Sequence, residues 1–141
     1  MIRTRWVFVA CLLIVASVEA RANDNIAGGD PRRITVRLQE YRFQPAEIAL
    51  KTGEEVELTM VNDGKVMHEF ITEALQGLSV TMEMNGIVAE TLGLAELEIP
   101  PKFSVVLRFT PEKSGEYLIA CRAKAPKEHY QEGMKGHFLI R

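Results

Sequence analysis

Residues 115–136 read GEYLIACRAKAPKEHYQEGMKG and combine two strand-like runs with three potential metal ligands. Apolar residues occupy alternate positions up to Cys121, and the alternation resumes after Met134. This pattern predicts two strands joined by a loop. Seven residues separate Cys121 from His129, and four separate His129 from Met134. A loop anchored by a strand at each end leaves its thiol, imidazole and thioether little freedom. The stretch therefore predicts a metal site on a β scaffold.

A second imidazole comes from an earlier strand-like run. His68 lies in the segment VMHEF (66–70), where alternation places it on the same face as its apolar neighbours. Thiolate, imidazole and thioether suit copper, and a trigonal Cys/His/His set with a weak axial Met is typical of electron-transfer sites. His68, Cys121, His129 and Met134 therefore predict a site for one copper ion.

The N-terminus carries the pattern of a secretory signal peptide. Arg3 and Arg5 precede an apolar run over 6–18, and the small-x-small segment ARA follows at 20–22. The run is shorter than the roughly 20 residues that a bilayer-spanning helix needs. We predict a signal peptide over residues 1–22, and hence an exported protein that is periplasmic in a Gram-negative bacterium and has no stable membrane insertion.

The net charge and the cysteine count exclude some functions and one structural feature. Without residues 1–22, Lys+Arg falls from 17 to 14 and Asp+Glu from 19 to 18, so the net charge of the mature chain is −4. This acidic balance argues against a nucleic-acid binder. The mature chain keeps one of the two cysteines, Cys121, which therefore cannot form an internal disulfide.

Short alternating runs with Gly- and Pro-containing turns fill most of the mature chain, and helical periodicity is almost absent. This pattern indicates an all-β fold, an antiparallel sandwich or barrel. Residues 23–32 are polar and are expected to form a flexible leader, and 33–141 form one domain. Segment 72–101 is the least regular: we expect a turn of helix at 72–76 and a hairpin centred on the dipeptide NG at 85–86.

The chain resembles a cupredoxin, the plastocyanin/azurin superfamily of type 1 blue copper proteins, over residues 33–141. The resemblance is carried by segments in the expected order: YRFQP (41–45), TGE (52–54), Asn62, HEF (68–70), the run 100–109, GEY (115–117), Cys121, His129 and GMKG (133–136). It implies a Greek-key β-sandwich. It also implies that His68, Cys121 and His129 are equatorial copper ligands and Met134 the axial one, in a protein that carries single electrons.

Each donor also has an ordinary structural explanation. A lone Cys or Met at a strand end is commonly core filler, and a lone His among apolar residues is commonly a hydrogen-bonded core residue. Their joint occurrence in this order favours copper. Three other side chains are assigned structural positions: His137 at the surface, Glu69 on the face opposite His68, and Tyr117 in the core with a tethered hydroxyl, as in a tyrosine corner.

Alternative functions remain open at this level. Multicopper oxidases and copper nitrite reductases need further histidines, whereas this chain has three, so we expect no enzyme. A Cys/His hydrolase would leave Met134 unexplained, and the thioether favours copper over zinc. Copper storage, delivery or resistance is the stronger alternative, because Met82 and Met84 share one strand face and could bind Cu(I). Core packing is the simpler explanation of both.

A monomeric single-copper protein needs a redox partner, such as a cytochrome, oxidase or reductase. The resemblance suggests docking at the end of the molecule where the edge of His129 nears solvent. Four basic residues surround the ligand loop and could steer an acidic partner: Arg122, Lys124, Lys127 and Lys135. The seven-residue gap before His129 is longer than in short-loop relatives, which leaves a blue and a green site both open.

Overall fold

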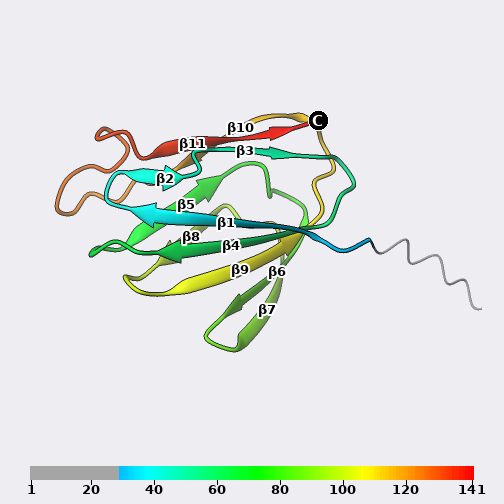
Figure 1. Cartoon of the computed structure of the whole chain (residues 1–141), viewed down its shortest axis with the longest axis horizontal. Helices are drawn as coiled ribbons and strands as arrows, with labels where there is room; N and C mark the ends of the chain where they lie inside the picture. Colours follow the sequence, from blue (N-terminus) through cyan, green and yellow to red (C-terminus); the bar gives the residue numbers. More distant parts are fainter. Residues whose placement is uncertain (1–28) are drawn as a thin grey trace, which may run out of the picture.

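The computed structural model describes residues 29–141; the predicted signal peptide and most of the predicted leader lie outside them. The described chain consists of strands and connecting loops (Figure 1). The strands are β1 (Arg32–Gln39), β2 (Arg42–Gln44), β3 (Glu47–Leu50), β4 (Val56–Asn62), β5 (His68–Thr72), β6 (Ser79–Met84), β7 (Ile87–Leu92), β8 (Glu96–Ile99), β9 (Ser104–Phe109), β10 (Gly115–Ala120) and β11 (Lys135–Ile140).

The strands form two sheets, with the orders β2-β1-β4-β9-β6-β7 and β3-β11-β10-β5-β8. The predicted all-β sandwich is confirmed, and the chain passes repeatedly from one sheet to the other. The sheets are not purely antiparallel, however, because β1 pairs with β4 and β3 with β11 in parallel. These pairs join strands connected through the opposite sheet, so no hairpin forces them to run in opposite directions.

The core lies between the sheets and follows the alternation of the sequence. In β4 the burial alternates along the whole strand, with Val56, Leu58 and Met60 facing inward. The Phe138 ring packs edge-on against Phe70 in its own sheet and Phe109 in the other, at centroid distances of 6.1 and 6.3 Å. Burial of each such side chain contributes about 1.5–3 kcal/mol.

The irregular segment 72–101 is partly as expected. The NG hairpin is confirmed: Asn85 and Gly86 have φ values of 52° and 76° and connect β6 to β7. In place of the expected helical turn at 72–76, Thr72 ends β5 and the residues after it form hydrogen-bonded turns, with the Gln76 N–H donating to the Glu73 carbonyl at 3.2 Å. No helix or strand was expected at residues 96–99, where the structure forms β8, which pairs with β5.

Several connections meet at one end of the sandwich, the left end in Figure 1. They include the β1–β2 turn, the β4–β5 loop and the long β10–β11 loop. β5 starts at this end, β10 ends there and β11 starts there. The predicted donor residues therefore come to the same end of the molecule. Over residues 29–141, no helix is long and apolar enough to cross a bilayer.

Candidate metal centre

The four predicted donors come from strand ends and from the loop between two strands. His68 is the first residue of β5, Cys121 follows β10, Met134 precedes β11, and His129 lies in the loop between them. All four side chains are fully buried. The structure thus places every predicted donor in one buried cluster at the end of the sandwich.

Three donor atoms form a compact triangle. The His68 and His129 Nδ1 atoms are 3.1 Å apart, and the Cys121 Sγ lies 3.2 Å from His129 Nδ1 and 3.9 Å from His68 Nδ1. One central ion with bonds of about 2.0–2.3 Å would give edges of about 3.5–4.0 Å, close to these values. The donor chemistry and the triangle therefore fit a single metal ion, and His68, Cys121 and His129 could hold one.

Backbone hydrogen bonds tie the loop donors to one another. The Met134 N–H donates to the His129 carbonyl at 2.9 Å, and the Met134 carbonyl accepts from the Cys121 N–H at 3.2 Å. The His129 N–H donates to the Ala123 carbonyl at 2.9 Å. The ligand loop is therefore closed on itself beside the triangle, which limits how far its donors can move.

Glu69 connects this loop to β5, as its predicted structural role requires. Its backbone N–H donates to the Cys121 Sγ at 3.2 Å, and its carboxylate accepts from the Arg122 N–H at 2.9 Å. The hydrogen bond to sulfur favours the thiolate, whereas the carboxylate fixes the residue that follows Cys121.

Burial sets the protonation of the donors. Together with the nearby His129 ring, which has a smaller effect, burial lowers the pKa of His68 to about 4. Burial also raises the pKa of the Cys121 thiol, against the opposing effect of the Glu69 N–H. His68 is therefore neutral near pH 7, the form that binds metal, whereas Cys121 must release its proton when a metal binds.

Asn62 holds the loop that leads to His68, and sequence reasoning assigned it no role. Its buried amide donates to the carbonyls of Val66 and Ile99 at 2.9 and 2.7 Å, and its oxygen accepts from the Gly64 N–H at 2.9 Å. The Asn-x-Gly spacing could have predicted this role, because an Asn side chain often forms a hydrogen bond with the backbone two residues later in the chain.

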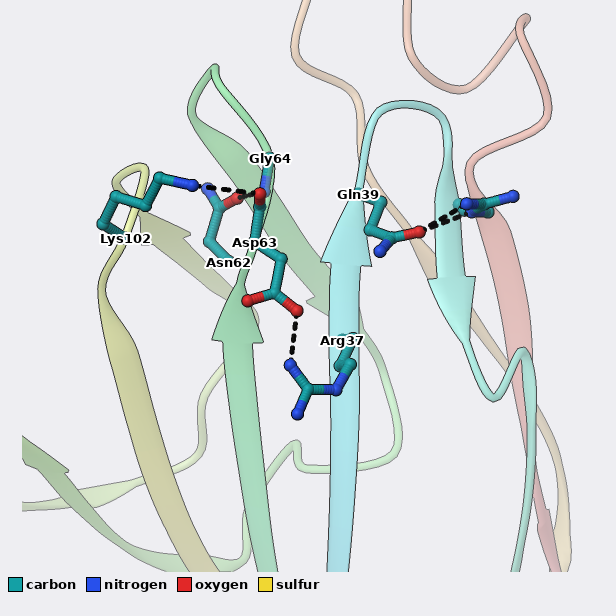
Figure 2. Close-up of polar contacts among 7 residues, drawn as sticks. Arg37, Gln39, Asn62, Asp63, Gly64 and Lys102 are labelled. Atoms are coloured by element: carbon teal, nitrogen blue, oxygen red, sulfur yellow. Dashed lines mark hydrogen bonds and ion pairs between the residues drawn. The ribbon is translucent and has the colours of Figure 1, made fainter.

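Figure 2 shows further polar contacts at the start of the β4–β5 loop, which leads to His68. The Arg37 guanidinium bonds the Asp63 carboxylate at 2.5 Å, and the Lys102 ammonium reaches the Asp63 carbonyl at 3.4 Å. β1, β4 and the β8–β9 connection are thereby linked at the end of the sandwich that carries the donors.

A family model described as a cupredoxin-like domain matches residues 6–140. The chain belongs to the cupredoxin-like family. Its buried His68, Cys121, His129 and Met134 form a cluster typical of the type 1 copper site of cupredoxins, and copper is the cofactor that this cluster fits.

Individual relatives agree with this family. The copper-resistant cuproprotein CopI of Rubrivivax gelatinosus is 29% identical over 104 residues, which are 71% of this chain and 60% of CopI. The chain thus spans 60% of the length of that relative. Auracyanin B shares the fold with a TM-score of 0.53 at 19% identity, over 84% of this chain and 95% of auracyanin B.

Multicopper oxidases contain a similar fold within longer chains. The enzyme from Campylobacter jejuni matches with a TM-score of 0.58 at 15% identity, over 80% of this cupredoxin and 31% of the oxidase. McoA from Aquifex aeolicus matches with a TM-score of 0.60 at 13% identity, over 79% and 30% of the two chains. At these identities the likeness shows the fold alone.

One expectation drawn from the cupredoxin resemblance is wrong: the edge of His129 does not near solvent. His129 is fully buried, and its Nε2 lies 3.1 Å from the Ala125 carbonyl. The long segment 122–128 folds back over the imidazole, and the ring of Tyr41 covers it from the β1–β2 turn. Donation from Nε2 to this carbonyl leaves Nδ1 free to face the triangle.

Gly64 is required where His68 meets the neighbouring loops. A Cβ at this position would lie 2.8 Å from His68 Nε2, 2.9 Å from Glu40 Oε1 and 3.1 Å from Asn62 Oδ1. The first two separations are shorter than real Cβ contacts and the third is unusually tight, so any larger residue would displace polar groups beside the His68 ring. Sequence reasoning singled out neither Gly64 nor Glu40, because the approach is between segments far apart in the chain.

The remaining predicted residues lie around the site or away from it. Lys127 pairs with Glu132 at 3.6 Å, and Lys135 lies 5.5 Å from the centre of the Tyr130 ring. Arg122 and Lys124 line a pocket of about 210 Å³ beside this loop.

His137, Tyr117 and the two methionines of β6 lie outside the donor cluster. His137 faces Glu116 at 3.7 Å, and the Tyr117 hydroxyl donates to the Lys113 carbonyl at 3.5 Å. Met82 and Met84 are partly buried and pack against the core, in line with a structural role.

Proposed function

We propose that this chain binds one copper ion through His68 Nδ1, Cys121 Sγ and His129 Nδ1, with Met134 as axial ligand, and exchanges single electrons with redox proteins. The observation that carries this proposal is the buried triangle, whose three donor atoms all lie within 4.8 Å of one another before any metal binds. Copper, when bound, supplies the Cu(I)/Cu(II) couple.

The protein contributes a donor set that needs little rearrangement. Burial excludes water from the triangle, and the backbone bonds of Met134 and the N–H of Glu69 hold the loop donors in place. Donors that stay in place when the charge of an ion changes keep the energetic cost of electron exchange low. This rigidity favours electron exchange over chemistry on a bound substrate.

We further propose that the chain is not an enzyme. In the described part of the chain, the other cluster of possible ligands consists of Glu69, Glu96 and Glu98, and His137 pairs with Glu116 away from the donors. These residues do not supply the additional histidine ligands that a second copper centre needs.

Copper resistance is the second candidate, and the relative CopI favours it. CopI is described as a copper-resistant cuproprotein and is 29% identical over 104 residues. The covered His129 also suits a protein that holds its metal away from solvent. In this role the protein would protect the periplasm by binding copper.

Reduction of the copper-loaded protein in the presence of a Cu(I) chelator separates the two roles. An electron carrier gives a reversible one-electron wave in voltammetry and keeps its copper through repeated cycles. Release of Cu(I) to the chelator at each reduction would contradict the carrier proposal. It would support copper handling, as would copper-sensitive growth of a deletion strain that wild type rescues and Cys121→Ser does not.

The proposed electron carrier would meet its partner through its basic residues. Arg122, Lys124, Lys127 and Lys135 surround the ligand loop and would steer an acidic patch of a redox partner in the periplasm. Association with such a partner should slow as salt rises, because exposed charges are screened within about 8 Å at physiological ionic strength. Rates that do not change with ionic strength would contradict this docking surface.

A further inference from the structure

The His129 imidazole is enclosed by two segments far apart in the sequence. Its Nε2 lies 3.1 Å from the Ala125 carbonyl in the ligand loop. The Tyr41 ring packs edge-on against it, with a centroid distance of 5.3 Å and an interplanar angle of 79°. His129 is fully buried whereas Tyr41 is only half-buried, so the tyrosine ring lies between the imidazole and solvent.

Tyr41 occupies a backbone position that glycine would adopt more easily. It is the second residue of the two-residue turn between β1 and β2, and its φ is +67°. A left-handed conformation costs an L-residue about 1–2 kcal/mol, and a bulky side chain there is uncommon. Strain of this kind persists where the surrounding structure holds it, commonly at functional sites.

The same turn also contacts the loop that carries His68. The Glu40 carboxylate accepts a hydrogen bond from the Lys65 N–H, three residues before His68. On the outer side of the turn, the Lys127 ammonium lies 5.9 Å from the centre of the Tyr41 ring. The turn is therefore fixed against both histidine-bearing segments, and the tyrosine ring is held between His129 and Lys127.

We propose that Tyr41 is the lid of the copper site and determines how readily small molecules reach the His129 side of it. The half-buried ring packs against the buried imidazole, and the β1–β2 turn holds it there. The expected consequence for copper, slower metal exchange, rests on the proposed function. The covering of the His129 imidazole by Tyr41 does not, because it is present in the metal-free protein.

The test uses Tyr41→Gly, because glycine accepts the backbone conformation of the turn and so removes the ring without disturbing the fold. Tyr41→Phe keeps the ring and serves as the conservative variant. Phe103→Ala is the control: it removes another partly exposed aromatic ring from the same end of the molecule, in the β8–β9 connection rather than in the ligand loop. Circular dichroism verifies that each variant is folded.

In the metal-free proteins, carbethoxylation of His129 by diethylpyrocarbonate is followed by mass spectrometry, with His137 as internal reference. We expect Tyr41→Gly to accelerate His129 modification by about tenfold. This factor corresponds to a decrease of about 1.4 kcal/mol in the free energy needed to expose the imidazole. Tyr41→Phe and Phe103→Ala should react at the wild-type rate. In the copper-loaded proteins, removal of copper by EDTA should follow the same order.

Equal His129 reactivity in wild type and Tyr41→Gly would overturn the proposed lid. An equal acceleration in Phe103→Ala would also overturn it, because it would indicate general loosening of this end of the molecule. Failure of wild type to form a copper–thiolate absorption band would instead overturn the proposed function. The carbethoxylation result would still decide whether Tyr41 covers His129.

Discussion

His68 illustrates how one buried side chain links protonation, stability and metal binding. Its ring is fully buried and lies beside a second imidazole, so a positive charge on it is disfavoured. The pKa of about 4 follows mainly from this burial. The neutral ring is therefore available to a metal over most of the physiological pH range.

The lowered pKa of His68 predicts a loss of stability in acid. In the unfolded chain His68 takes up a proton near pH 6.5, whereas the folded protein resists it down to about pH 4. The unfolded state thus binds more protons between these values, and the free energy of unfolding of the metal-free protein falls as the pH falls from 6.5 towards 4.

Urea unfolding of the metal-free protein across this pH range measures the effect. His68→Gln cannot take up this proton, so its stability should depend less on pH than that of wild type. His137→Gln serves as the control because His137 is half-exposed and lies outside the donor cluster. A pH dependence that His68→Gln leaves unchanged would contradict the assignment.

Asn62 is expected to contribute more to stability than its neighbour Asp63. Asn62→Ala removes three hydrogen bonds and leaves the buried carbonyl of Ile99 without its donor, which should cost about 2–4 kcal/mol. Asp63→Ala removes an exposed ion pair with Arg37 and should cost less than about 1 kcal/mol. Chemical denaturation measures both, and equal losses would show that the amide network is not what holds this loop.

At the scale of elements, β11 approaches the β2–β3 connection very closely. A Cβ on Gly136 would lie 2.2 Å from the Ala46 carbonyl oxygen, which the His137 N–H also binds. A methyl group at this position must push β11 away from Ala46. Because Met134 lies directly before β11, this displacement should reach the donor cluster.

Gly136→Ala is therefore predicted to lower stability by about 1–3 kcal/mol and to shift the absorption bands of the copper-loaded protein. Gly29→Ala is the control, because no atom lies within 4 Å of the added Cβ. Thermal unfolding and the visible spectrum measure the two effects. Unchanged spectra with normal stability would mean that the backbone adapts without moving Met134.

Some elements could be predicted from local sequence and others could not. The hairpin at Asn85–Gly86 was predictable because both residues favour positive φ, and the strands around Cys121 and Met134 followed from alternation. The parallel pairs β1–β4 and β3–β11 were not, because pairing between strands distant in the chain leaves no local signal. β8 was missed because it is only four residues long and the apolar residues of its segment are unevenly spaced: Leu92, Leu94, Leu97 and Ile99.

The candidate site likewise has parts that could be predicted from the sequence and parts that could not. Its four donors could be named from residue type, order and spacing, because coordination chemistry restricts the choice. The cover over His129 could not, since it depends on a turn from β1 and on the path of residues 122–128. Nor could the roles of Glu40 and Gly64, which meet His68 only in the folded chain.

At the scale of the whole molecule, a metal ion would connect β5 to the β10–β11 loop and so stabilise the sandwich. Ligand at about 1,000 times its dissociation constant contributes about 4.1 kcal/mol. For a domain of this size we expect Tm to rise by more than about 10 °C. The far-UV circular dichroism should hardly change, because the donors are in place in the metal-free protein. A large gain of strand signal on metal addition would contradict a preformed site.

The most direct test of the central claim is the visible and EPR spectrum of the mature protein with one equivalent of Cu(II), recorded beside that of Cys121→Ser. A type 1 site predicts an intense thiolate-to-copper charge-transfer band in wild type and its loss in Cys121→Ser. The position of the band also separates a blue site from a green one. A weak spectrum that is the same in both proteins would contradict copper ligation by Cys121, and with it the proposed electron carrier.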